Sequence, residues 1–395
     1  METSFTDFKA SIDKLASSEY IQKPLVPVKK NILLSYVSDA TGCGHIRNVF
    51  PISYLNAIYG KNQDIIPIIT PHYIWQNDIL LKTRSIYFQR HMSPEQLNAV
   101  RQYKNLQPQF GYKMVWDIDD FIWGKNEKQG GSTEDGVPSY NFGWPGITFP
   151  IKEASIEIMK LMDLLTVSTE YLKEYIRDVL KVETPINVVP NAIPKYFWGN
   201  KKRMPKTEYI KKPKVVYTGS PTHYNNQDKL KGDFDSSWLK WVLESVNKGK
   251  IDFWVMGGLP FFFESIKDKI HIVDWVNSYQ YHHAVKDINA DFGLMPLVPN
   301  NFNYSKSDIK AIELYSCGAV ALGTVFSNGK PSPYDNNPVR IPFEATSEEI
   351  DSVFESLRHP EKYNSVVNEQ YKKLITEHRY LEDPVYVKML VDNYF

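Results

Sequence analysis

A glycine-rich turn near the N-terminus carries the first side chains whose types and spacing could do chemistry. The stretch "SYVSDATGCGHIRNVFPISYL", residues 35–55, leads from an apolar run through Gly42 and Gly44 to His45 and Arg47. Glycines let a backbone approach a phosphate closely, a helix N-terminus offers free N–H groups, and Arg47 would add a charge-assisted contact. A tight strand-to-helix turn without a ligand has the same sequence pattern. The stretch by itself therefore leaves both interpretations open.

A second stretch, "NNFNYSKSDIKAIELYSCGAVALGT" at residues 300–324, places charged side chains at the start of a predicted helix. Lys306 and Ser307 precede its first turn, where the helix dipole and the free N–H groups favour an anion. Lys310 follows one turn later. Glu313 lies further along, where a carboxylate can accept hydrogen bonds from a pair of ribose hydroxyls. A helix with solvated Lys and Glu side chains is the alternative interpretation.

A third stretch, "VWDIDDFIWG", concentrates Asp117, Asp119 and Asp120 at the end of a predicted strand. Clustered carboxylates can bind Mg²⁺ or Mn²⁺. They can also orient a sugar hydroxyl or act as the base toward an acceptor, and one of the three can serve as a helix cap. We favour the sugar or acceptor role for Asp119 and Asp120, expect no bound metal at the site, and leave dependence on a divalent metal open.

Two series of alternating strand and helix patterns must position these side chains. Such βαβ alternation implies a largely parallel sheet with helices on both faces. The sequence therefore predicts an α/β protein with two Rossmann-like domains that face each other across a cleft, with ligands at the carboxyl ends of the strands. The predicted strands cover residues 31–37, 64–70, 84–90, 112–119, 164–169 and 186–191 in the first series, and 213–220, 250–258, 270–276, 290–297, 319–325 and 339–343 in the second.

The length of 395 residues fits two domains, each able to bury its own core. We predict an N-terminal domain over residues 1–195 and a polar, basic, proline-punctuated linker over 196–213. A second domain is expected over 214–370, and a C-terminal helix with a short apolar tail over 371–395, packed back on the first domain. The glycine- and aromatic-rich run at 130–146 is long for a connector and is a candidate acceptor-side lid.

Composition excludes several classes of protein. Lys plus Arg and Asp plus Glu both total 46, so no overall field attracts the chain to nucleic acid or to a membrane, and any such attraction must come from a local patch. No run of 18 apolar residues and no signal-peptide pattern is present, which predicts a cytoplasmic protein without a membrane span. The 2 cysteines are too few for a disulfide framework and are expected as thiols. The aromatic content of 14% suits clefts for sugars or bases.

The sequence contains motifs in an order that resembles the nucleotide-sugar glycosyltransferases of the GT-B fold, most closely the retaining glycosyltransferase family 4. The motifs, in chain order, are "GCGHIRN", "LLTVSTEYLKEYI", "INVVPNAIPKYFW", "VVYTGS", "DKLKGDF", "VMGG", "ADFGLMPL" and "SKSDIKAIELYSCGAVALG". The resemblance implies a GT-B architecture and the transfer of a hexose or pentose from a nucleotide diphosphate sugar, expected to be a UDP-sugar, to an acceptor hydroxyl with retention. The donor is then a substrate, and no cofactor is required.

In the second domain, the resemblance implies that Glu313 holds the ribose of the donor. The first glutamate of the family's E-x7-E motif falls at Ser305, so that half of the motif is absent. Lys306 and Ser307 are then expected to contact the phosphates or the transferred sugar.

The family's diphosphate clamp and base pocket fall on the same domain. Lys231 matches the lysine of the clamp, whereas the arginine is missing and Ser220 or His223 stands near its place. Trp275 and Val276 match the segment that lines the base.

In the first domain, the resemblance places Gly44, His45 and Arg47 beside the transferred sugar or the donor phosphate. Asp119 and Asp120 fall where the family often has a histidine near the donor sugar. We therefore predict Asp119, Asp120 and His45 as catalytic residues.

The acceptor is the least determined part of the function. The Tyr- and Asn-rich composition and the Lys-Ser-Asp-Ile-Lys variant are similar to glycosyltransferases of large bacteriophages, some of which modify hydroxymethylcytosine in phage DNA. Duplex DNA in the host cytoplasm is therefore the leading acceptor, with a cell-envelope saccharide or a lipid-linked sugar as the competing one. Two other classes stay open: an NAD-dependent oxidoreductase, although Arg47 replaces the third glycine of its fingerprint, and a non-catalytic sugar-nucleotide binding module.

Overall fold

The computed structural model describes residues 29–39, 41–123, 151–199, 204–219, 223–224, 226, 232–234 and 236–395. Ser220, Lys231 and the candidate lid at 130–146 lie outside these residues, so their predicted roles remain predictions. In the described residues, no helix is both long and apolar enough to cross a membrane.

A six-stranded parallel sheet forms the framework of the N-terminal half, with the strand order β2-β1-β3-β4-β5-β6. Its four central strands are mostly buried, as expected for a parallel sheet covered on both faces, whereas the edge strands β2 and β6 are only partly buried. The strands are β1 (Ile32–Tyr36), β2 (Ile66–Thr70), β3 (Thr83–Gln89), β4 (Lys113–Ile118), β5 (Leu164–Val167) and β6 (Ile186–Val188). The six strands predicted in this half are therefore all present.

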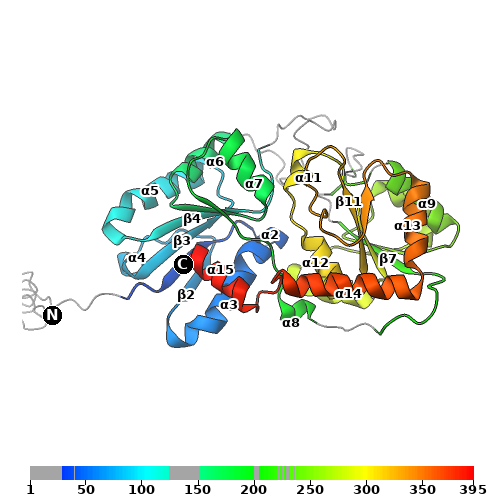
Figure 1. Ribbon diagram of the computed structural model, residues 1–395. Helices are drawn as coiled ribbons and strands as arrows, with labels where there is room; N and C mark the ends of the chain where they lie inside the picture. The colour runs from blue at the N-terminus through cyan, green and yellow to red at the C-terminus, as the bar shows by residue number, and fades with distance from the viewer. Residues whose placement is uncertain are drawn as a thin grey trace, which may run out of the picture.

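Helices cover both faces of this sheet (Figure 1). The best defined of them, α5, begins with a capping box in which Ser93 and Gln96 exchange side-chain and backbone hydrogen bonds, and it ends at Gly111 in a left-handed conformation. The short α2 passes directly into a π-helix at His45–Val49. The helices are α2 (Gly42–Gly44), α3 (Phe50–Tyr59), α4 (Asn77–Lys82), α5 (Pro94–Phe110), α6 (Ile151–Lys160) and α7 (Glu170–Glu174), with a second π-helix at Tyr175–Val179.

A second six-stranded parallel sheet forms the C-terminal half, with the order β12-β11-β10-β7-β8-β9. Its strands are β7 (Lys214–Thr218), β8 (Asp252–Met256), β9 (His271–Val273), β10 (Phe292–Met295), β11 (Val320–Val325) and β12 (Arg340–Pro342). Its helices are α9 (Ser236–Asn247), α10 (Ser278–Ile288), α11 (Asn301–Ser305), α12 (Ile309–Ser316) and α13 (Ser347–Leu357), with a 3-10 helix at Phe261–Lys269. Both halves are thus α/β sandwiches of the predicted class.

The C-terminal residues return to the first domain. The long helix α14 (Pro360–Thr376) packs on the second domain and spans the predicted boundary at residue 370, which therefore lies inside a helix. The predicted apolar tail is a helix, α15 (Pro384–Tyr394), because Pro384 occupies its first turn and the Asp383 side chain accepts a hydrogen bond from the Val385 N–H. Figure 1 shows α15 beside α3 on the first domain.

The two domains touch where α7 meets α11 (Figure 1). Tyr171 donates a hydrogen bond to Asn301 Oδ1 at 2.6 Å, and the Thr169 hydroxyl donates to the Ser305 carbonyl at 3.0 Å. This contact places the start of α12 next to the first domain, because α11 leads directly into it.

Candidate functional site

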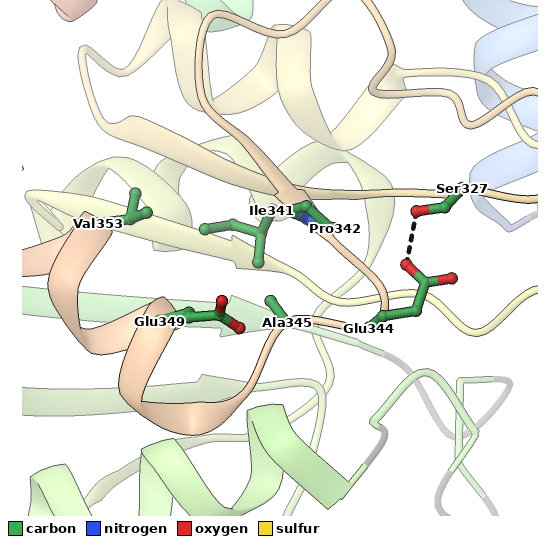
Figure 2. Close-up of a pocket in the computed structure, with 7 residues that line it drawn as sticks. All are labelled: Ser327, Ile341, Pro342, Glu344, Ala345, Glu349 and Val353. Atoms are coloured by element: carbon green, nitrogen blue, oxygen red, sulfur yellow. Dashed lines mark hydrogen bonds between the residues drawn. The ribbon is translucent and has the colours of Figure 1, made fainter.

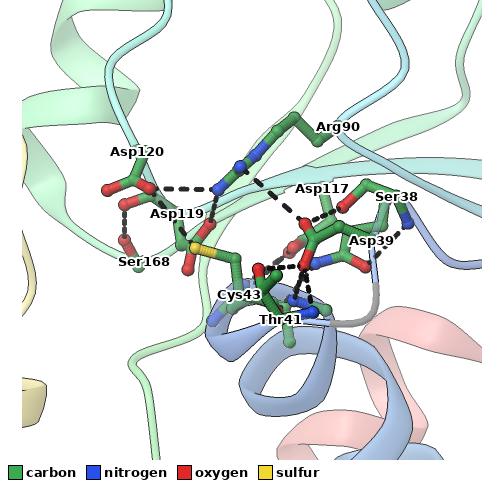
Figure 3. A network of polar contacts seen from close by, with 12 residues as sticks. Ser38, Asp39, Thr41, Cys43, Arg90, Asp117, Asp119, Asp120 and Ser168 are labelled. Atoms are coloured by element: carbon green, nitrogen blue, oxygen red, sulfur yellow. Dashed lines mark hydrogen bonds and ion pairs between the residues drawn. The ribbon is translucent and has the colours of Figure 1, made fainter. Parts of the chain in front are cut away.

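Acidic side chains gather around one arginine at the carboxyl edge of the N-terminal sheet (Figure 3). Nη2 of Arg90, which follows β3, lies 3.0 Å from Asp119 Oδ1 and 3.0 Å from Asp120 Oδ2. Its Nη1 lies 3.9 Å from Asp39 Oδ2 in the loop after β1. The Cys43 thiol donates to Asp120 Oδ2 at 3.4 Å. We call these five residues the acidic cluster.

The backbone of Arg90 adopts a conformation that is rare for its residue type. Its φ is +49°, in the left-handed region that favours glycine. Its N–H donates to the Asp117 carbonyl at 2.8 Å, which ties the end of β3 to β4. This turn directs the guanidinium toward the two carboxylates that follow β4.

The two carboxylates of the acidic cluster differ in their environment. The Asp119 side chain is 9% exposed, and that of Asp120 is 31% exposed. Burial, followed by the charge of Asp120, raises the pKa of Asp119 to about 6, although Arg90 opposes the shift. Burial also raises the pKa of the Cys43 thiol, so this group stays protonated and can donate to Asp120. Asp120 therefore has the more accessible carboxylate.

The same side chains meet a geometric requirement for a metal site. One ligand atom from each of Cys43, Asp119 and Asp120 lies within 4.8 Å of the others. However, the Arg90 guanidinium already supplies a cation to both carboxylates, and a metal ion would have to displace it. The expectation that no metal is bound here stays a prediction.

Asp117 and Arg47 form a separate, closed ion pair. Arg47 Nε lies 3.0 Å from Asp117 Oδ1, and its Nη2 lies 2.5 Å from Oδ2. Arg47 Nη1 donates to the Val189 carbonyl at 2.6 Å and to Asn191 Oδ1 at 2.9 Å, and Arg47 is only 1% exposed. The predicted phosphate contact of Arg47 is therefore corrected, because its guanidinium is buried and makes four hydrogen bonds to protein oxygens. Asp117, within β4, is neither a member of the acidic cluster nor a helix cap.

Gly44 and His45 also make contacts that the sequence did not indicate. A Cβ atom at Gly44 would lie 1.9 Å from the Asp39 carbonyl oxygen, so this glycine is required by the turn itself. His45 Nδ1 lies 2.7 Å from the Thr41 carbonyl, and the ring meets Tyr279 of α10 edge-on at 4.9 Å. His45 thus lies at the junction of the domains, and its catalytic role stays a prediction.

Basic side chains gather at the carboxyl edge of the second sheet, in what we call the basic cluster. His223 follows β7, and its Nδ1 lies 2.6 Å from Asp233 Oδ2. Lys306 Nζ lies 3.2 Å from the same nitrogen, and Lys310 Nζ lies 3.5 Å from it. Because Nδ1–H must donate to the carboxylate at 2.6 Å, the two ammonium groups are close cations rather than further donors to that nitrogen.

The charges of the basic cluster are strongly coupled. Burial, followed by Lys306 and Lys310, lowers the pKa of His223 to about 4, so its ring is neutral at pH 7. Burial opposes ionisation of Asp233, but the two lysines and His223 more than offset it and hold its pKa well below the usual range. Burial lowers the pKa of Lys310 to about 8. At neutral pH the cluster therefore carries two cations and one anion.

Gly232 explains how the basic cluster closes. Its φ is +61°, and a Cβ atom there would lie 1.7 Å from the His223 carbonyl oxygen. The Asp233 N–H donates to that same carbonyl at 3.1 Å. A side chain at position 232 would therefore push Asp233 away from His223.

Glu313 lies on α12, further into the domain than the two lysines. Its carboxylate is buried, and Tyr281 of α10 donates to its Oε2 at 3.1 Å. Burial raises the pKa of Glu313 to about 8, and the Tyr281 hydrogen bond and Lys310 oppose the shift. With this pKa the group is mostly protonated at pH 7, and a buried carboxyl group with one hydroxyl partner still keeps acceptor capacity for a ligand.

The remaining predicted residues lie near these elements. Trp275 follows β9 and is 59% exposed, whereas Val276 is partly buried against the core. Ser307 accepts a hydrogen bond from Asn191 Nδ2 of the first domain at 2.8 Å. Lys306 and Ser307 thus lie between α11 and α12, and Glu313 lies within α12. Lys310 was not among the predicted site residues, although its position four residues after Lys306 was a usable signal.

A pocket away from both clusters lies between β12 and α13 (Figure 2). Its described lining includes Glu344 and Glu349 and no Lys or Arg. Ser327 donates a hydrogen bond to Glu344 at 2.6 Å inside it. Its acidic lining is unsuited to an anionic ligand.

No protein-family model matches the sequence, and no curated protein matches it significantly. Solved structures do match. A glycosyltransferase from Rickettsia africae is 12% identical, with a TM-score of 0.57 over 93% of this chain and 98% of that one. HepE from Anabaena, solved with UDP and glucose, is 7% identical, with a TM-score of 0.55 over 92% and 98%. An α-glucosyltransferase, solved with UDP and a 13-mer DNA containing an HMU base, is 11% identical, with a TM-score of 0.50 over 93% and 99%.

These similarities establish the fold, because they extend over nearly the full length of both chains. The chain has the GT-B architecture of two Rossmann-like domains, and the predicted fold class is confirmed. At such low identity, the similarity of fold does not transfer an activity.

Proposed function

We propose that the protein is a glycosyltransferase that moves a sugar from a nucleotide diphosphate donor, a UDP-sugar, to an acceptor hydroxyl. The observation that carries this proposal is the start of α12, where Lys310 lies about one turn and Lys306 about two turns before the buried carboxyl group of Glu313. Cations followed by a carboxylate match the order of diphosphate and ribose in a nucleotide sugar. Fold similarity to glycosyltransferases supports the same activity by analogy.

The basic cluster would bind the departing diphosphate. Lys306 and Lys310 supply positive charge beside the N-terminus of α12, whose dipole favours an anion. Lys231 would add a third cation. Glu313 would accept hydrogen bonds from the ribose hydroxyls, and the exposed ring of Trp275 could stack on the base.

The acidic cluster would face the acceptor. Asp120 has one oxygen, Oδ1, without a partner among the described residues, and it can accept a hydrogen bond from the attacking hydroxyl. We propose retention by same-face substitution. The acceptor oxygen bonds to the anomeric carbon as the bond to the diphosphate breaks, and the hydroxyl proton passes to a leaving phosphate oxygen.

Hydroxymethylcytosine in duplex DNA is the proposed acceptor, and a location in the cytoplasm of a phage host belongs to the same proposal. The support is the resemblance of the sequence to phage glycosyltransferases and the similarity of the fold to an α-glucosyltransferase solved with DNA. The sequence from 201 to 214 is rich in Lys and Arg, in a chain whose total formal charge is zero, and could contribute a local positive charge. A cell-envelope saccharide or a lipid-linked sugar is the competing acceptor.

Mass spectrometry tests enzyme class, donor and acceptor together. Duplex DNA with hydroxymethylcytosine is incubated with the protein and a panel of UDP-sugars, with unmodified duplex of the same sequence as the control. A hexose or pentose mass increment on the modified duplex alone is the expected result. UDP release without an increment would move the search to saccharide or lipid acceptors. Binding of a UDP-sugar without cleavage to UDP would indicate a non-catalytic binding module.

An NAD-dependent oxidoreductase has less support. Its fingerprint requires a glycine at position 47, where the buried Arg47 pairs with Asp117. Nicotinamide absorbance in the presence of the protein tests this alternative directly.

A further inference from the structure

Arg90 joins the three carboxylates of the acidic cluster, and the proposed transfer step gives it no role. Figure 3 shows the side chains of Asp39, from the loop after β1, and of Asp119 and Asp120, from the loop after β4, converging on its guanidinium. The two aspartates after β4 share a single nitrogen, Nη2. One guanidinium therefore fixes the separation of two carboxylates that would otherwise repel each other.

We propose that Arg90 is a positioning residue that holds Asp119 and Asp120 as one acceptor-binding pair and keeps Asp120 Oδ1 turned to the acceptor hydroxyl. This inference rests on the proposed glycosyl transfer.

The backbone of Arg90 supports a functional role. A left-handed conformation costs a non-glycine residue on the order of 1 kcal/mol or more, and such residues concentrate at functional sites. Glycine at position 90 would remove that cost, but it would also remove every contact to the carboxylates. The side-chain contacts thus offset the cost of the backbone conformation.

The charges around Arg90 indicate what its removal would do. Facing the guanidinium are the carboxylates of Asp39, Asp119 and Asp120 and the thiol of Cys43, whereas Asp117 is neutralised by Arg47 behind them. Three carboxylates thus share one cation. Without Arg90, Asp119 would take up a proton at higher pH, because Arg90 is the largest influence opposing its raised pKa.

The test compares Arg90→Met and Arg90→Lys with the wild-type protein. Because the carboxylate that meets the acceptor loses its position, we expect Arg90→Met to lower kcat for transfer by about 100-fold, within the range of acid–base contributions. The affinity for UDP, which binds at the other domain, should stay within about twofold. If transfer requires ionised Asp119, the acidic limb of the pH–rate profile of the wild-type protein lies near pH 6. In Arg90→Met this limb should move up by about one pH unit.

Arg90→Lys keeps the charge but cannot reproduce the planar guanidinium. We expect it to restore the position of the acidic limb while kcat stays at least about tenfold low. Arg101→Met is the matched control, because Arg101 is exposed and its ion-pair partner among the described residues is the exposed Glu157. This control should behave as wild type.

Wild-type turnover and an unchanged pH profile in Arg90→Met would overturn the inference, and wild-type turnover in Arg90→Lys would overturn a role for the guanidinium geometry. If Arg90→Met does not fold, Arg90→Lys alone decides. Carboxylate ¹³C NMR titration provides a readout that does not depend on turnover, with Asp119→Asn used to assign the signal. If the wild-type protein transfers no sugar, the proposed function fails, whereas an unchanged Asp119 titration in Arg90→Met would refute the positioning role.

Discussion

The acidic cluster of the first domain and the basic cluster of the second occupy equivalent places at the carboxyl edges of their sheets, but their charges are opposite. Around Arg90, three carboxylates share one cation. Around Asp233, two lysines and a neutral histidine share one carboxylate. Two domains of the same architecture therefore acquire different chemistry from the few residues that follow their strands.

The difference fits two different ligands. An excess of cations in a buried setting suits a diphosphate, which must be bound and then leave as an anion. An excess of carboxylates suits a neutral hydroxyl, which donates a hydrogen bond to a carboxylate before its proton passes to the leaving phosphate. The assignment of one ligand to each cluster is wrong if substitutions in either cluster affect donor binding and sugar transfer equally.

Asp120→Asn should have the largest effect. It removes the charge of the more exposed carboxylate without changing its shape, so kcat should fall by about 100-fold or more while the Kd of UDP stays unchanged. Steady-state kinetics and calorimetry measure the two quantities. Asp178→Asn, at an exposed pair with Arg177, is the control. Wild-type turnover would show that Asp120 is structural.

Lys306→Met, in the basic cluster, should weaken donor binding. Loss of one charge-assisted contact should raise the Kd of UDP by about 10- to 100-fold. The Kd of uridine should hardly change, because uridine has no phosphate. Lys267→Met, at an exposed pair with Glu264, serves as the control. An equal loss for uridine and UDP would contradict a phosphate contact.

Glu313→Ala separates the proposed ribose contact of the second domain from its proposed phosphate contact. Loss of the ribose contact should raise the donor KM by about tenfold and lower turnover less. Uridine and UDP should lose affinity by the same factor, in contrast to Lys306→Met. An unchanged KM would remove Glu313 from the ribose role.

The pH dependence of UDP affinity should show the smallest effect. The pKa of Lys310 is lowered to about 8, so its positive charge is present at pH 7 and is lost as the pH rises through 8. The Kd of UDP should therefore rise by about fivefold between pH 7 and pH 9.5. Calorimetry at several pH values measures the trend, and it should be flatter in Lys310→Met. The same slope in both proteins would assign the effect to another group.

The sequence predicted the strands and the start of α12 well, because apolar periodicity and helix-start signals are local. It did not predict Arg90 as a site residue, because an arginine at the end of a strand pattern gives no sign of a left-handed turn. The pairing of Arg47 with Asp117 was also missed. These residues lie 70 positions apart, and only the packing of α3 and its preceding turn on β4 brings them together.

The helix α15 has a consequence for how the protein is made. Its Leu390 and Tyr394 pack against Leu33 of β1 and Tyr87 of β3 in one apolar cluster on the first sheet. The rings of Tyr87 and Tyr394 are 4.5 Å apart. During synthesis, the part of this face that α15 covers stays exposed until the entire second domain has left the ribosome. The first domain can therefore complete its folding only after the second has been translated, and a ribosome that stalls before residue 384 leaves an apolar surface for chaperones to bind.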